Sequence, residues 1–223
     1  MINELSAALQ LASPALPIGS FSYSQGLETA VDLRLVNDEQ TAEVWIAAGL
    51  TEIIGRCDAP VMISIFRSLH GGSERELVRL NTWYLASRES LELREETVQM
   101  GWSLIKLGKA LNWIESQSLV NRLTQVAFPT AFAASALALG LSEETALTTF
   151  CFGWLENQVL ASMKLVPLGQ VAGHRILTEC RKMIGDVVNS AKAVSFDGVS
   201  SVAPMLAIVS ARHENQYTRL FRS

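Results

Sequence analysis

The sequence is poor in charge, and the charge that it has is dispersed. Asp, Glu, Lys and Arg make up 18% of the residues, below the roughly 25% that is usual for globular domains. The net charge is −4, and Lys and Arg form no basic patch of the kind that a nucleic-acid backbone requires. DNA and RNA are therefore not expected as partners. Because 49% of the residues are hydrophobic, the chain has either a large core or an apolar surface that meets a partner.

Cysteines and targeting signals are also scarce. The three cysteines are widely spaced and odd in number, which favours free thiols in a reducing, cytoplasmic setting. The first basic residue is Arg34, so the basic region of a signal peptide is missing. The uncharged run at residues 123–142 contains Pro129, and it predicts a buried helix instead of a membrane span. We expect a cytoplasmic protein that does not enter the membrane.

The motifs of several enzyme classes are absent. The sequence has no Walker A pattern, no G-x-G-x-x-G and no G-x-S-x-G, so it indicates neither a nucleotide enzyme nor a serine hydrolase. His70, His174 and His213 form no H-x-x-x-H pair, and no C-x-x-C occurs, so no metal site of familiar spacing is present. We expect these histidines to be core or surface residues, and we expect no cofactor.

Capping residues and apolar spacing predict two helices in the first half of the chain. Asn37 followed by Gln40 resembles a capping box that opens a helix running towards Ile54. Ser73 followed by Glu76 resembles a second one, and it opens an amphipathic helix.

Further segments support an entirely helical chain. Ser142 with two glutamates after it predicts a helix that Pro167 ends. The apolar segment 61–66 follows Pro60 and has no evident partner strand, so we interpret it as helical. The predicted fold class is all-α, with one helical-bundle domain over residues 1–223.

An uncharged segment, PIGSFSYSQGLETA at residues 17–30, is rich in serine and aromatic side chains. It can form a loop in which Ser20 or Ser22 caps a helix that continues to Asp32. It can also lie at a protein interface, where such side chains pack and hydrogen-bond at little desolvation cost. We expect both roles, because a cap needs one serine and the segment has three.

The segment SRESLELREET at residues 87–97 holds several carboxylates at helical spacing. A di-iron site is excluded, since no His follows a Glu by three residues. Two interpretations remain open. The segment is either a solvated helix face with ion pairs inside the helix or a charged docking surface.

Two more segments contain polar or charged side chains that need a hydrogen-bonding or ionic partner, either within the chain or in a second protein. In the segment at residues 153–170, Glu156 and Lys164 lie along one side of a mostly apolar helix, and they pair internally or face a second protein. Residues 210–223 are a frayed, solvated tail or a mobile peptide that orders on a partner. In the second case Tyr217 and Phe221 are two of its apolar anchors.

Four segments together resemble the UreF family of urease accessory proteins: LPIGSFSYSQGLE, SRESLELREE, WLENQVLASMKLVPLGQ and SARHENQYTRLFRS. The resemblance implies an all-helical homodimer that is a scaffold and not an enzyme. It implies binding to UreD (called UreH in some bacteria), recruitment of the nickel-carrying GTPase UreG with modulation of its GTPase activity, and delivery of nickel to apo-urease. Nickel is then handled by the assembled complex and is not tightly bound by this chain. The alternative is a helical enzyme acting on a small molecule, with Glu156 and Lys164 as a buried acid/base pair.

The motifs and the resemblance give one set of expected partner-binding residues. They are Ser20, Tyr23, Ser24, Glu28, Arg88, Glu89, Glu92, Arg94, Glu156, Gln158, Lys164, Arg212, His213, Tyr217, Arg219, Leu220, Phe221 and Arg222.

Overall fold

A computed structural model describes residues 2–115 and 118–223, and this part of the chain contains helices and turns but no strand. The predicted all-α class is confirmed. In chain order the helices are α1 (Ile2–Ala12), α2 (Leu27–Asp32), α3 (Glu39–Ala48), a π-helical segment (Gly49–Asp58), α4 (Ala59–His70), α5 (Glu74–Ala86), α6 (Leu91–Ala110), α7 (Phe128–Ala138), α8 (Glu143–Leu165), α9 (Gln170–Cys180), α10 (Ile184–Ala193) and α11 (Pro204–His213).

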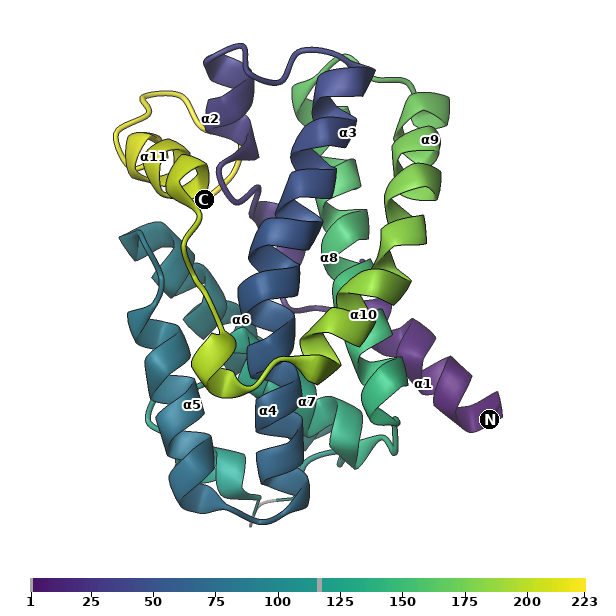
Figure 1. Cartoon of the computed structure of the whole chain (residues 1–223), viewed down its shortest axis with the longest axis vertical. Coiled ribbons are helices and arrows are strands. Elements are labelled where there is room, and N and C mark those ends of the chain that lie inside the picture. Colours follow the sequence, from purple (N-terminus) through teal and green to yellow (C-terminus); the bar gives the residue numbers. More distant parts are fainter. Residues whose placement is uncertain (1, 116–117) are drawn as a thin grey trace.

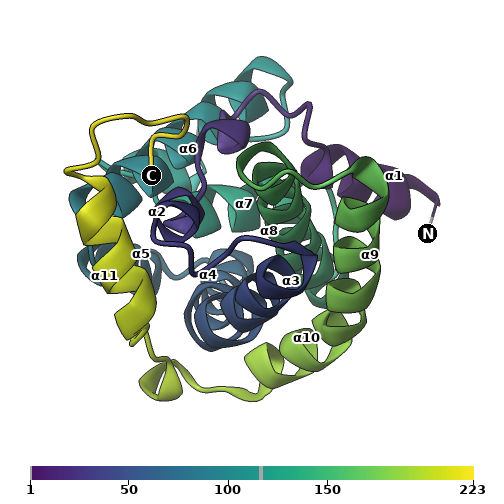
Figure 2. The same cartoon turned by 90° about the horizontal axis from the view of Figure 1, so that it is seen from above.

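Helices α7 and α8 lie at the centre, and α1, α9, α10 and α11 lie around the outside (Figure 1, Figure 2). α4 and α6 pack against α7, while α1 and α9 pack against α8. Every residue of α7 from Pro129 to Ala136 is buried, because small and apolar side chains cover all its sides. The prediction of a buried helix in residues 123–142 is confirmed. None of the helices in the described residues is long and apolar enough to cross a membrane.

A long helical run crosses the molecule from α3 through the π-helical segment into α4 (Figure 1). It begins with a capping box in which Asp38 Oδ1 accepts the amide of Thr41 and Thr41 Oγ1 accepts the amide of Asp38. The prediction of Asn37 and Gln40 as the capping pair was therefore wrong by one residue. The helical interpretation of residues 61–66 is confirmed.

The other predicted helix starts have mixed outcomes. The Ser142 hydroxyl accepts the amide of Thr145 and caps α8, which ends at Leu165, as predicted. α5 follows Ser73, but the Ser73 side chain makes no cap hydrogen bond. The prediction that Ser20 or Ser22 caps a helix was wrong, because these residues form a separate 3₁₀ turn and α2 begins only at Leu27.

Candidate functional site

The site is built around α2, whose start depends on Gly26. This residue has φ +80°, a backbone conformation that glycine adopts without strain. A Cβ atom there would lie 2.5 Å from Val209 Cγ2 in α11. Gly26 therefore lets α2 and α11 approach closely, and the Ser24 hydroxyl accepts the amide of Glu28 in the first turn of α2.

The buried carboxylate of Glu28 binds the C-terminal tail, residues 214–223. Its two oxygens accept the backbone amides of Leu220, at 2.6 Å, and Phe221, at 2.9 Å. Hydrogen bonds to a charged acceptor are about twice as strong as neutral ones. One side chain of α2 thus fixes the tail against the body of the protein.

His213, at the end of α11, is completely buried between two carboxylates. Its Nε2 lies 3.2 Å from Glu28 Oε2, and its Nδ1 lies 2.5 Å from Glu92 Oε2 in α6. His213 therefore joins α2, α6 and α11 at one point.

Arg219 binds the tail to α6 and also joins residues within the tail. It donates from Nη1 to Glu92 Oε1 at 2.6 Å. Its Nε and Nη2 donate to the carbonyl oxygens of Gln216 and Glu214, at 2.8 and 2.7 Å. The turn of the tail is thus held by the same carboxylate that binds His213.

The end of the tail pairs with residues 22–24. The amide of Arg222 donates to the carbonyl of Ser22 at 2.8 Å, and the amide and hydroxyl of Ser24 both donate to the carbonyl of Ser223. Tyr23, between the two serines, is 5% exposed. Burial raises the pKa of the Tyr23 hydroxyl, as does the charge of nearby Glu96. Ser22 and Ser24 of the 17–30 segment thus bind the tail within the same chain.

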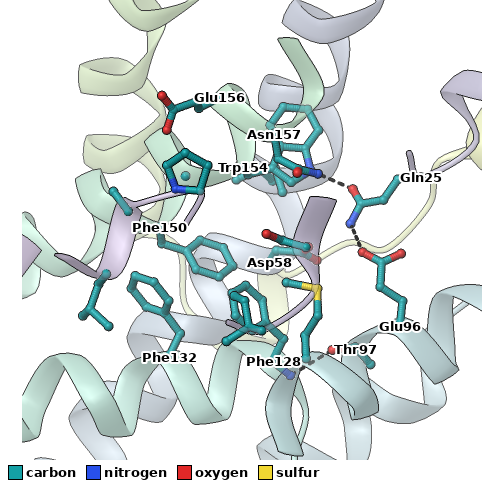
Figure 3. Close-up of a pocket in the computed structure, with 18 of the residues that line it drawn as sticks. Gln25, Asp58, Glu96, Thr97, Phe128, Phe132, Phe150, Trp154, Glu156 and Asn157 are labelled. Atoms are coloured by element: carbon teal, nitrogen blue, oxygen red, sulfur yellow. Dashed lines mark hydrogen bonds between the residues drawn. The ribbon is translucent and has the colours of Figure 1, made fainter. Parts of the chain in front are cut away.

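Glu96 connects the tail to the interior of the protein. It accepts hydrogen bonds from Ser223 Oγ at 2.6 Å and from Gln25 Nε2 at 2.7 Å. Gln25 Oε1 in turn accepts the indole N–H of Trp154 in α8, at 2.7 Å (Figure 3). Burial raises the pKa of Glu96 to about 7, although both of its hydrogen bonds favour the charged form.

A cavity of about 80 Å³ lies beside Gln25 and Glu96. In Figure 3, Gln25 and Glu96 lie on one side of the cavity and the rings of Phe132 and Phe150 lie on the other, with Asp58 between them. The rings of Phe132 and Phe150 pack edge to face with centroids 5.2 Å apart. The volume is enough for several water molecules beside the polar groups.

The prediction of a free, mobile tail was wrong for part of residues 210–223. Residues 210–213 belong to α11, and Phe221 is 5% exposed and packs inside the protein, with the ammonium group of Lys164 5.6 Å from its ring centroid. Tyr217 and Leu220 instead point to solvent. A backbone held by Glu28 explains the order of the tail, since its hydrogen bonds are satisfied within the chain.

The interpretation of residues 87–97 as a solvated helix face was also wrong. Arg88 has a buried side chain paired with Asp58 at 3.2 Å, and Arg94 donates to the carbonyl of Leu85. Glu92 is bound by the tail, as described above. Of this segment, Glu89, Leu91 and Glu95 are exposed, whereas Ser90, Leu93, Glu96 and Thr97 are buried.

The side chains of the remaining expected residues make no hydrogen bond to Glu28, His213 or the tail in the described part of the chain. Glu156 is half-buried and Lys164 is exposed, so the predicted buried acid/base pair is wrong. The two residues are eight positions apart on α8, about 12 Å along the axis. Burial raises the pKa of Glu156. Ser20 borders the cavity, Gln158 is buried, and Arg212 is exposed on α11.

Sequence reasoning missed Gln25, Glu96 and Ser223 as site residues. Glu96 lies four residues after Glu92, and this spacing puts both on one helix face, so a signal was present. Gln25 carried no such signal. In residues 2–115 and 118–223, no group of three or more His, Cys, Asp or Glu side chains is arranged to hold a metal ion.

The fold and the site are those of an all-helical protein whose C-terminal tail closes over buried carboxylates. The model of the UreF family matches residues 36–181, which is more than half of the chain. The chain belongs to the UreF family, a family of urease accessory proteins. The 17–30 segment and the tail lie outside the matched residues.

Proposed function

We propose that this chain is a cytoplasmic, homodimeric scaffold and not an enzyme. It binds UreD (UreH), recruits the GTPase UreG, modulates GTP hydrolysis by UreG, and so directs nickel into apo-urease. The nickel passes through the assembled complex as cargo.

The observation that carries this proposal is a set of exposed apolar side chains on the fixed tail and on the segments that bind it, here called the tail platform. It consists of four large apolar side chains that are each more than half exposed: Phe21, Leu91, Tyr217 and Leu220. The Leu91 amide donates to Glu214, and Ser22 beside Phe21 accepts from Arg222. Hydrogen bonds to the tail therefore hold the segments that carry Phe21 and Leu91, while Tyr217 and Leu220 belong to the tail itself. Exposed aromatic side chains on a rigid base are typical of binding hot spots.

The enzyme alternative has less support. Its acid/base pair requires a buried ammonium group beside Glu156, but Lys164 is exposed and distant along α8. Three polar side chains that line the cavity, Gln25, Glu96 and Trp154, already pair with one another or with the tail. A surface for protein binding therefore explains more of the site than a catalytic centre does.

Co-purification with UreD and UreG, in nickel-free and nickel-loaded buffer, tests this function. The double variant Tyr217→Ala/Leu220→Ala should bind UreD with a Kd at least about tenfold higher than that of the wild type, as expected for hot-spot side chains. Trp102→Ala is the matched control, since Trp102 is an exposed aromatic residue of α6 outside the platform. Full capture of UreD by the double variant would contradict the proposed role of the platform.

A further inference from the structure

The cavity beside Glu96 extends from the surface into the core, between the end of α1 and α8. At one end of its lining Pro14 is exposed and Glu156 is half-buried. At the other end Asp58 and Glu96 are 6% and 4% exposed. Figure 3 shows Glu156 at the top and the two buried carboxylates below it. A group that enters beside Glu156 therefore ends at buried carboxylates.

Gly153, in the middle of α8, lines this cavity. A glycine inside a helix lowers the stability of the helix relative to alanine. A Cβ atom at this position would lie 3.8 Å from Ala12 Cα, which is an ordinary contact distance. At Gly101 and Gly173, by contrast, a Cβ atom would lie only 2.1 and 2.3 Å from its nearest neighbour. Packing against the described residues thus requires glycine at those two positions but not at position 153, where the missing side chain leaves room at the cavity.

The cavity has an excess of negative charge. Among its described lining residues Arg88 carries the positive charge, and it is paired with Asp58 at 3.2 Å. The structure shows no ion pair between Glu96 or Glu156 and a basic side chain of the described residues. Burial raises the pKa of both carboxyl groups, as expected for carboxylates that lose water without gaining an ion pair. A cation in the cavity would offset this loss.

The buried end of the cavity also offers hydrogen-bond acceptors. Each oxygen of Glu96 accepts one hydrogen bond from the described residues, from Gln25 Nε2 or from Ser223 Oγ, whereas a carboxylate oxygen has two acceptor sites. The opposite wall is apolar and contains the rings of Phe132 and Phe150 (Figure 3). Methylene groups pack against apolar walls, and aromatic rings attract a nearby cation. The cavity therefore suits a group with an apolar stem and a cationic end.

The size of the cavity narrows the choice of cation. Its volume of about 80 Å³ gives room for about six water-sized groups. A lysine side chain fits this space, because it has an unbranched four-carbon stem and a compact ammonium group with three donors.

We propose that this cavity binds the side chain of a lysine that a partner protein presents. The stem lies between the phenylalanine rings and Gly153, and the ammonium group donates to Glu96. The carboxylate of Glu156 attracts the cation at the entrance. None of the four side chains of the tail platform belongs to the described lining of the cavity. The inference therefore goes beyond the proposed function and does not rest on it.

Titration of the full chain with n-butylammonium chloride, followed by NMR of the Trp154 indole N–H, tests the site. Trp154 lines the cavity, so its signal should shift on binding. We expect n-butylammonium to bind at least about tenfold more tightly than n-butanol, a neutral molecule of the same chain length, because the ammonium group donates to a charged acceptor. Sodium chloride at equal concentration is the control for ionic strength.

Two pairs of variants separate the effect of charge from the effect of space. Glu96→Gln should weaken the binding of n-butylammonium at least about tenfold, whereas Glu95→Gln, on the exposed surface of α6, should leave it unchanged. Gly153→Leu should abolish binding because the new side chain fills the cavity. Gly153→Ala should retain binding because its methyl group makes only ordinary contacts. Thermal unfolding checks that each variant is folded.

A blocked lysine, Nα-acetyl-lysine methylamide, identifies the source of the ammonium group. It should bind at least as tightly as n-butylammonium, because its backbone stays at the entrance beside Glu156. Binding of n-butylammonium but not of the blocked lysine would assign the site to a free small amine and overturn the inference. The absence of a shift at millimolar n-butylammonium, equal binding of n-butanol, or wild-type affinity in folded Glu96→Gln and Gly153→Leu proteins would also overturn it. These measurements use the chain without UreD, so their failure is distinguishable from failure of the proposed function.

Discussion

Glu28 and His213 are 185 residues apart in the sequence, yet a carboxylate oxygen of Glu28 lies 3.2 Å from Nε2 of His213. The same carboxylate accepts two amides of the tail. The attachment of the tail therefore depends on one side chain of α2. Four predictions follow from this network and from the histidines.

Replacing Glu28 by Gln should destabilise the protein by roughly 2–3 kcal/mol. The amide keeps one acceptor oxygen, but its NH₂ group faces a tail amide that loses its charged acceptor. Urea unfolding measures the change. Glu95→Gln is the control, because exposed Glu95 neighbours Glu96 in α6 and its substitution should change the free energy of unfolding by less than about 0.5 kcal/mol. Equal effects of the two substitutions would contradict the role of Glu28.

The tail should contain separable residues for folding and for binding. Phe221→Ala should cost roughly 3–5 kcal/mol, because it leaves a cavity in the core. Leu220→Ala changes a side chain that is 63% exposed, so it should cost less than about 0.5 kcal/mol. Chemical denaturation of both variants checks this contrast. A Phe221→Ala protein as stable as the wild type would show that the tail lies free in solution.

Stability should fall as the pH rises through the titration of Glu96. Its pKa is about 7 in the folded protein, against 4.5 without the effects of folding. Between these values the folded state binds more protons than the unfolded state, so raising the pH favours unfolding. From about pH 5.5 to about pH 8, the wild type should lose about 2 kcal/mol more than Glu96→Gln does.

Comparing the two proteins by urea unfolding at both pH values isolates this effect, since their other titrating groups are the same. Gln at position 96 still accepts from Gln25 through its carbonyl oxygen. If the difference in stability between the two proteins is the same at both pH values, Glu96 does not titrate in this range.

Nickel should bind weakly to this chain alone. His70 and His174 are exposed, and among the described residues neither belongs to a group of three or more potential metal ligands. Both nitrogens of His213 are engaged by carboxylates. A metal needs several convergent ligands for tight binding. Titration calorimetry should find no submicromolar site, and a tight one-to-one site would argue against a scaffold that only handles nickel in a complex.

The sequence predicts most helices but not their continuity. Ser142 and Pro167 bound α8 because capping and helix breaking are local effects. Asn37 and Asp38 are both good capping residues, so the choice between them depended on backbone conformation that the sequence does not display. The π-helical segment has no distinct spacing signal, because it lies between two ordinary helical stretches in one continuous run.

The candidate site could be predicted only in its parts. The motifs containing Glu28, Glu92 and His213 were visible as separate polar segments. Their burial was not, because carboxylates are mostly exposed unless partners offset the loss of water. Those partners come from segments far apart in the sequence, and only the tertiary structure brings them together.

The pairing of residues 22–24 with Arg222 and Ser223 also sets an order of events during synthesis. A growing chain carries Glu28 and Glu92 long before His213 and the tail have been added. Until then these carboxylates lack their partners and remain hydrated, since burying them alone is unfavourable. Helices within the earlier residues can already pack as they leave the ribosome. The region around α2 is therefore completed last. A chain released before residue 213 retains a solvent-exposed, acidic surface there.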